Sequence, residues 1–230
     1  MAKKKASDPL QTEKSVGEIL SKTDQFIDKY LKQILISVGA IILIVVGYIA
    51  FHNLYLIPKE KEAEVALFSG QTYFGNQQWE IALNGDSIDY IGFLDIIQDF
   101  KGTSSANLAK AYAGICQYRL GDYEAALENL KSYSGKDILF AAQVTGAIGD
   151  CYVNLGEVKE GINYFNKAAA KANSKLLSPI YLNKAAVAYE SLGDYKSALD
   201  IYSTIKSKYP ESQEANAVDK YIERAKTLIK

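Results

Sequence analysis

The feature of this sequence that most constrains its fold is one short motif that occurs three times. The motif reads LGDYEAALENL from Leu120, LGEVKEGINYF from Leu155 and LGDYKSALDIY from Leu192. The glycines at its second position are 35 and 37 residues apart. Internal similarity at a nearly constant period predicts a stack of equivalent structural units, each of which needs its neighbours to bury its apolar face.

Small and aromatic residues keep fixed distances from each motif glycine. Seven residues before it stands Gly or Ala, and five residues after it stands Ala or Gly again. Glycine tolerates the left-handed conformation that ends a helix, and small residues let two helix backbones approach closely. Each repeat is therefore expected to form an antiparallel pair of helices. The positions assigned to this framework are Gly114, Gly121, Tyr123, Ala126, Gly149, Gly156, Phe165, Tyr189, Gly193, Tyr195 and Ala198.

A period of about 34 residues with this order of small and aromatic residues resembles the tetratricopeptide repeat, or TPR. The first and third copies follow the pattern closely, whereas the second has Val158 and Gly161 where Tyr and Ala are usual. The resemblance implies an all-α chain that folds as a solenoid of helical hairpins.

The pattern extends beyond the three repeats on both sides. Upstream, Gly70, Tyr73 and Trp79 keep the spacing of the later copies if Gln77 stands at the turn. Downstream, apolar residues recur on one face of an amphipathic helix, which is what the end of a solenoid needs. The predicted TPR domain covers residues 58–230, with a degenerate repeat at 60–104, repeats at 107–140, 142–175 and 179–212, and a capping helix at 211–230.

An apolar run precedes the repeats. No charged residue occurs between Lys32 and Lys59. A helix over residues 34–57 would rise about 36 Å, enough to cross a hydrocarbon core about 30 Å thick. A cleaved signal peptide is the competing interpretation, but bulky Tyr48 stands three residues before the best cleavage site, after Ala50, and the run is longer than a signal core. We therefore predict an uncleaved transmembrane signal anchor.

The charges on the two sides of this run differ in sign. Residues 1–33 carry seven Lys against five acids, whereas residues 58–230 carry 19 basic and 22 acidic groups. Because Lys and Arg near a span favour the cytoplasmic side, we predict a single-pass inner-membrane protein with a cytoplasmic arm, which includes Lys3, Lys4 and Lys5, and a periplasmic C-terminal domain. The formal net charge of −1 gives no case for nucleic-acid binding.

The chain has two cysteines, Cys116 and Cys151, and each lies five residues before a motif glycine. Equivalent sites in stacked repeats lie about 10 Å apart, which is too far for a disulfide. Buried free thiols are therefore favoured over the disulfide that a translocated domain would permit.

The first helix of each pair lines a concave groove in TPR stacks, and helical spacing indicates which residues face it. This face is mostly apolar and lacks the Lys, Asn and Arg set with which some TPR domains clamp a C-terminal carboxylate. A groove for an apolar or helical protein segment is favoured; packing of some of these residues against the capping helix is the alternative. The predicted partner-binding residues are Leu67, Phe74, Leu108, Ala111, Ile115, Tyr118, Asp150, Val153, Ile180, Asn183 and Val187.

Catalysis finds little support in the sequence. The single histidine, His52, belongs to the membrane segment, so no Ser–His, Cys–His or His-metal site is expected in the folded domain. Glu124, Glu128 and Glu157 fit a solvated helix face, and GDSIDYIGF lacks the spacing of a calcium loop. We therefore expect no enzyme, metal, cofactor or small-molecule substrate.

A short helix leads into the first full repeat in the stretch YIGFLDIIQDFKGTSSANLAKAYAGICQYRLGDYEAAL. This stretch and the order of arm, anchor and array resemble the YfgM-like membrane-anchored TPR proteins, over residues 20–230. The resemblance implies a scaffold ancillary to the Sec translocon, which binds that translocon, a periplasmic chaperone or emerging secreted clients. Two alternatives are an outer-membrane assembly or cell-wall coordination factor and a regulatory subunit of an envelope enzyme.

Overall fold

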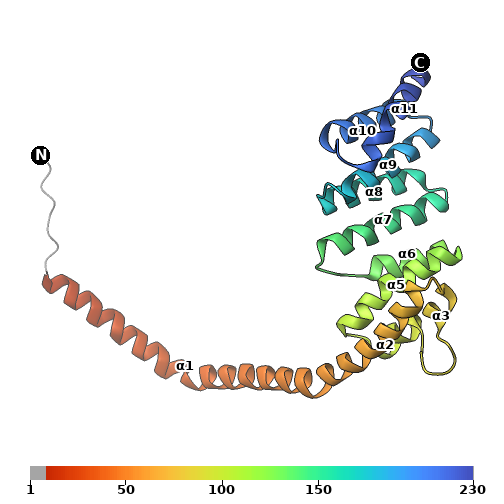
Figure 1. Cartoon of the computed structure of the whole chain (residues 1–230). Helices are drawn as coiled ribbons and strands as arrows, with labels where there is room; N and C mark the ends of the chain where they lie inside the picture. The colour runs from red at the N-terminus through yellow and green to blue at the C-terminus, as the bar shows by residue number, and fades with distance from the viewer. Residues whose placement is uncertain (1–8, 230) are drawn as a thin grey trace, which may run out of the picture. The chain divides into compact units, whose positions relative to one another are not determined.

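The structure is a computed structural model that describes the backbone of residues 9–229 and the side chains of residues 29–33 and 35–229. Every regular element in this part of the chain is a helix, and no strand occurs in it (Figure 1). The predicted all-α class is therefore confirmed. The chain separates into two compact units, one ending at Ile57 and the other beginning at Pro58.

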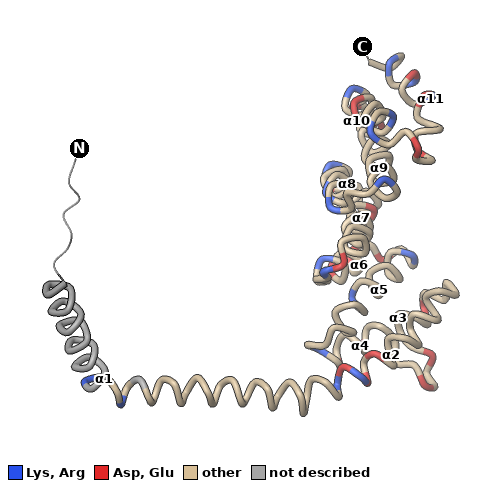
Figure 2. The backbone as a smooth tube through the Cα atoms, turned by 60° about the vertical axis from the view of Figure 1, so that its left-hand side comes forward, with Lys and Arg blue, Asp and Glu red and all other residues tan. Residues whose placement is uncertain are grey.

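The first unit contains helix α1 (Pro9–Phe51) and the π-helical turn η1 (His52–Leu56). Within Lys29–Gly75, an 18-residue window has a mean hydropathy of 2.8, and none of it is buried. This is the one helix among the described residues that is long and apolar enough to cross a membrane. Figure 2 shows a stretch of the helix without charged residues. Lys3, Lys4 and Lys5 of the predicted arm lie outside the residues that the structure describes.

The second unit is a stack of helix pairs (Figure 1). The pairs are α2 with α3, α5 with α6, α7 with α8 and α9 with α10, whereas α4 and α11 are single helices. The bounds are α2 Ile57–Gly75, α3 Trp79–Asn84, α4 Phe93–Asp99, α5 Ser104–Leu120, α6 Tyr123–Ser132, α7 Ile138–Asn154, α8 Val158–Ala172, α9 Leu177–Ser191, α10 Tyr195–Lys208 and α11 Gln213–Leu228.

Left-handed residues form the turns inside the pairs. The three motif glycines have φ angles of 89°, 83° and 75°, where a side chain would be strained. In the first pair this place is taken by Gln77, with a φ of 59°. After the first and third glycines, Asp122 and Asp194 each accept a hydrogen bond from the backbone N–H three residues later. Each carboxylate therefore caps the second helix of its pair.

Glycines let the two helices of a pair touch. A methyl group added to Gly114 would lie 2.6 Å from Cγ of Leu130, and one added to Gly149 would lie 2.7 Å from the ring of Phe165. The large side chain of one helix thus occupies the space that the glycine of the other leaves free. Of the other framework residues, Ala126 and Ala198 are buried, and Tyr123, Tyr189 and Tyr195 are half-buried.

Successive pairs are joined by the same kind of close approach. A methyl group on Gly146 of α7 would lie 2.1 Å from the ring of Tyr181 of α9. Ala111 of α5 shares one buried cluster with Val144 and Ile148 of α7. The first helices of consecutive repeats therefore cover part of one another, and this decides which of their residues stay accessible.

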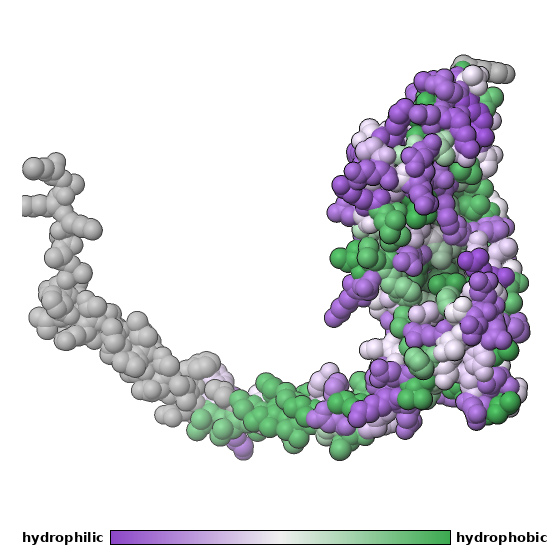
Figure 3. All heavy atoms as spheres, viewed as in Figure 1, coloured by the Kyte–Doolittle hydropathy of each residue, from purple (hydrophilic) through white to green (hydrophobic). Residues whose placement is uncertain are grey.

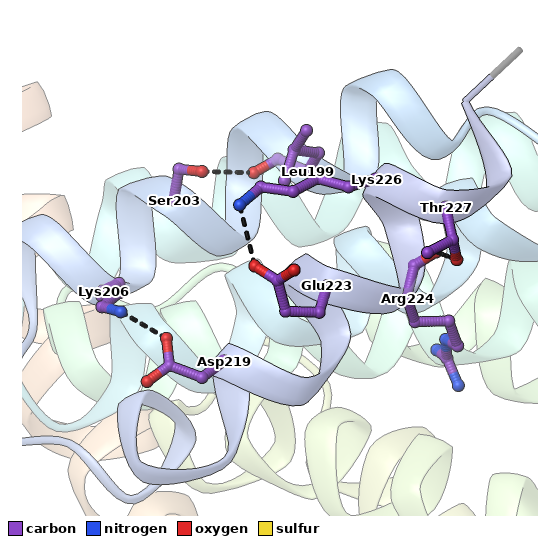
Figure 4. A network of polar contacts seen from close by, with 8 residues as sticks. All are labelled: Leu199, Ser203, Lys206, Asp219, Glu223, Arg224, Lys226 and Thr227. Carbon is purple, nitrogen blue, oxygen red and sulfur yellow. Dashed lines mark hydrogen bonds and ion pairs between the residues drawn. The ribbon is translucent and has the colours of Figure 1, made fainter.

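Helix α11 covers the C-terminal end of the stack. Its Val218 is completely buried. Charged contacts join the same helix to its neighbours: Lys206 of α10 pairs with Asp219 (Figure 4), and Arg224 pairs with Glu190 of α9. The helix thus buries an apolar face and presents a polar one to solvent, as a solenoid cap requires.

One aspartate organises the loop between α3 and α4. Oδ1 of Asp86 accepts hydrogen bonds from the backbone N–H groups of Ile88, Asp89 and Tyr90 at 2.9, 3.0 and 2.9 Å. The hydroxyl of Tyr73 in α2 donates to the other oxygen at 2.7 Å. The loop is therefore tied to the first helix pair by a single carboxylate.

The two cysteines are free and buried. Cys116 belongs to the cluster between α2, α3, α4 and α5, whereas Cys151 belongs to the cluster between α5, α6 and α7. Burial raises the pKa of each thiol to about 12. Both side chains therefore act as small apolar groups.

Candidate functional site

The first helices of the pairs, α2, α5, α7 and α9, present side chains that are neither fully buried nor fully solvated; we call this surface the A-helix face. On the side of the second unit seen in Figure 3, hydrophobic residues lie among hydrophilic ones. Half-buried on this face are Phe74, Leu108, Ile115, Tyr118, Asp150, Val153, Ile180 and Asn183, and Val187 is 50% exposed.

Two of the residues predicted for this face are buried. Ala111 has no exposed surface, and Leu67 is only 6% exposed. The small side chain of Ala111 is covered because it packs in a cluster with residues of α6 and α7. Helical spacing alone placed both residues on the surface, but the neighbouring helix decides whether such a position is open.

An ion pair joins α7 to α9, the last two helices of the A-helix face. Nζ of Lys184 in α9 lies 2.8 and 2.6 Å from the two carboxylate oxygens of Asp150 in α7. Their side chains are 39% and 22% exposed. Burial raises the pKa of Asp150, although Lys184 acts in the opposite direction. Burial and the charge of Asp150 also raise the pKa of Tyr118 in α5. Groups from three consecutive repeats thus meet here.

Sequence reasoning selected Asp150 and Tyr118 but missed Lys184. Lys184 follows Asp150 by 34 residues, which is close to one repeat period. A search for charges separated by one period would have found the pair, because equivalent positions on neighbouring first helices lie side by side in a solenoid.

A hollow of about 520 Å³ opens at the N-terminal end of the A-helix face, between α2 and α5. It brings together Leu67 and Leu108, both of which were predicted for the binding surface. Phe68, which was not predicted, also lines the hollow and is 71% exposed. The complete lining is Glu60, Glu64, Leu67, Phe68, Gln71, Ser104, Ser105 and Leu108.

A second hollow, of about 640 Å³, lies at the other end of the array. It is formed by the start of α9 and the connection between α10 and α11, and it contains Ile180. Basic residues Lys175 and Lys208 and acidic residues Glu211 and Glu214 share its lining.

The capping helix α11 does not bury the predicted partner-binding residues in the core cluster that it completes. The cluster that α11 completes is built from residues of α9, α10 and α11, and none of the predicted partner-binding residues is among them. Within the part of the chain whose side chains are described, no group of three or more His, Cys, Asp or Glu could hold a metal ion.

Comparison with known proteins agrees with this architecture. Two family models, both described as tetratricopeptide repeat, match residues 113–175 and 182–212. No curated protein matches the chain. The helix pairs, their turn glycines and these matches together show TPR repeats in an all-helical, solenoid-like fold.

Solved structures extend the likeness over most of the chain. The MamA protein is similar with a TM-score of 0.53 at 15% identity, covering 72% of this chain and 87% of that one. A putative kinesin light chain from Podosopora anserina, with nearly identical TPR-like repeats, has a TM-score of 0.56 at 15% identity, with 74% and 87% covered. At this identity the likeness shows the fold, and it gives no support to one particular subgroup of TPR proteins.

Proposed function

We propose that this chain is a non-catalytic scaffold that is anchored in a membrane by one helix. The scaffold binds protein partners on its A-helix face. The main observation in support of the proposal is the residue composition of that face. It combines half-buried apolar residues such as Ile115 and Val153 with one ion pair, Asp150–Lys184. Apolar area supplies binding energy, and a few placed charges supply specificity.

The apolar helix supports the membrane part of the proposal. Its length and composition suit a single span. The excess of Lys before the run and the resemblance in residues 20–230 favour a domain on the periplasmic face of the inner membrane, with a role in protein translocation and chaperoning. The proposed partners are accordingly the Sec translocon, a periplasmic chaperone or a secreted client.

Site-specific crosslinking in cells tests the binding part. A photoreactive residue at Tyr118 is expected to give a protein adduct, because this side chain is partly exposed on the A-helix face, near the Asp150–Lys184 ion pair. The matched control is a photoreactive residue at Lys159, which is exposed on α8, a second helix. Equal adduct yields at the two positions would contradict the A-helix face as the binding surface.

A topology reporter fused after Lys230 tests the location. A reporter that is active only in the periplasm should be active, and one that is active only in the cytoplasm should be silent. The opposite result would overturn the periplasmic location while leaving the binding face untouched.

A further inference from the structure

We infer that the hollow between α2 and α5 binds an apolar segment of a protein partner that carries Lys or Arg next to its apolar residues. The inference rests on the proposed function and deepens it, since it names one place on the A-helix face and the chemistry of what binds there. Three observations support it: an exposed aromatic side chain, an apolar floor, and charged lining residues that are all acidic.

The exposed aromatic residue is Phe68. It is 71% exposed, and Val65, one turn earlier on α2, is equally so. Among the described residues from Pro58 onward, Phe68 is the one aromatic side chain in the exposed class. Buried aromatic side chains contribute disproportionately to protein interfaces, so a free phenyl ring at the rim of a hollow marks a contact point.

The floor of the hollow is apolar and already formed. Leu67 is 6% exposed and Leu108 is half-buried. Gln71 donates a hydrogen bond from Nε2 to the hydroxyl of Tyr112 at 3.1 Å, which ties α2 to α5 beside the hollow. A volume of about 520 Å³ falls within the range of about 300–1,000 Å³ that is typical of ligand pockets. A preformed site loses little entropy when a partner binds.

The charges around the hollow have one sign. Of the eight residues that line it, Glu60 and Glu64 are the charged ones. Glu60 is held in place because it accepts hydrogen bonds from the backbone N–H groups of Ser104 and Ser105 at 2.6 and 2.9 Å. Glu64 is exposed. Two carboxylates beside apolar side chains favour a partner with a cation beside its own apolar residues.

The second hollow has no such preference. Two lysines and two glutamates share its lining, so the local charges balance. The N-terminal hollow is therefore the part of the A-helix face at which a partner of defined charge is expected.

Peptide selection on the full chain in lipid nanodiscs tests this inference. Random 12-residue peptides displayed on phage are selected against the wild-type chain, and the affinity of the best peptide is then measured by fluorescence anisotropy. We expect selected peptides that combine Leu, Ile or Phe with Lys or Arg. Phe68→Ala should weaken binding by about 30-fold, as for an interface anchor. Glu64→Lys should weaken it by about two- to fivefold, as for an exposed ion pair.

The control is Ile88→Ala, because Ile88 is 85% exposed in the α3–α4 loop and does not line the hollow. This variant should bind like the wild type, and all three should keep the wild-type circular dichroism spectrum, because the altered side chains are exposed. Selected peptides that are acidic, or that bind Phe68→Ala as tightly as wild type, would overturn the inference and leave the scaffold proposal standing. The scaffold proposal itself fails if no peptide is enriched and Tyr118 gives no crosslink in cells.

Discussion

The amine of Lys184 lies within 2.8 Å of both carboxylate oxygens of Asp150, so one ion pair joins α7 to α9 across the A-helix face. The pair is partly buried, and burial raises the pKa of Asp150 more than the cation lowers it. Burying these two charges therefore costs desolvation free energy, and the packing of the two repeats keeps the charged groups together.

Replacing the cation should destabilise the fold. In Lys184→Met the carboxylate of Asp150, which is 22% exposed, loses its partner. We expect the free energy of unfolding at pH 7 to fall by about 1–2 kcal/mol, as for loss of a hydrogen bond to a charged group at a partly solvated site. Urea unfolding in detergent micelles measures this, with Lys159→Met on the exposed face of α8 as the control. A variant as stable as the wild type would show that the pair contributes nothing.

Replacing Asp150 tests how the free energy of unfolding depends on pH. The folded-state pKa of Asp150 lies above 3.8, so the folded chain binds this proton more tightly than the unfolded chain does. Ionisation of Asp150 therefore removes stability as the pH rises from 3.8 to the raised value. The stability of the wild type relative to Asp150→Asn should fall over that interval and be constant above it. Unfolding curves at a series of pH values measure the difference, and a rise instead of a fall would contradict the sign.

Close packing within a pair predicts an effect of a single methyl group. In Gly149→Ala the new methyl would meet the ring of Phe165 at 2.7 Å, so the helices must move apart. We expect a loss of about 1–3 kcal/mol in the free energy of unfolding. Gly75→Ala is the control, because nothing lies within 4 Å of its added methyl, and it should change stability by less than about 0.5 kcal/mol. Equal stability of the two variants would show that the helices of the pair are not in close contact.

The first helix of the domain caps another helix. Glu60 of α2 accepts hydrogen bonds from the backbone N–H groups of Ser104 and Ser105 at the start of α5. Glu60→Ala should lower the free energy of unfolding by about 1–2 kcal/mol, as for loss of a helix cap. Glu62→Ala, at an exposed position, should leave stability unchanged. If the two variants unfold alike, the contact between α2 and α5 does not stabilise the domain.

Acid should reveal the role of Asp86. Hydrogen bonds from the N–H of Tyr90 and from the hydroxyl of Tyr73 hold the pKa of this carboxyl well below its usual range. The stabilisation is complete above the unfolded pKa and is lost as the pH falls through the folded one. The stability difference between wild type and Asp86→Ala should therefore be constant above about pH 5 and shrink below it. A difference that is independent of pH down to acid unfolding would contradict this account.

Local patterns were enough to predict the helices and their turns. Gly121, Gly156 and Gly193 end helices because glycine takes a positive φ without strain, and all three have one. The placing of Gln77 at the first turn followed from spacing alone, and its φ is also positive. These features depend on neighbouring residues in the chain, which is the information that a sequence contains directly.

Contacts between repeats required the tertiary structure. The spacing that placed Ile115 and Tyr118 on a surface placed Ala111 there as well, yet Ala111 is completely buried in a cluster with residues of α6 and α7. The same spacing did not select Phe68 as a surface residue, yet this side chain is exposed at the rim of the N-terminal hollow.

The sequence by itself therefore determined the class of fold, the repeat period and the presence of an apolar helix, because each depends on periodicity or on a continuous run of residues. Only the tertiary structure decided which side chains form the A-helix face. The exposure of a side chain on one first helix depends on how closely the next first helix approaches. That approach is set by pairs such as Gly146 and Tyr181, which lie far apart in the sequence. The ion pair between Asp150 and Lys184 has the same origin, since neither residue reaches the other without the stacking of two repeats.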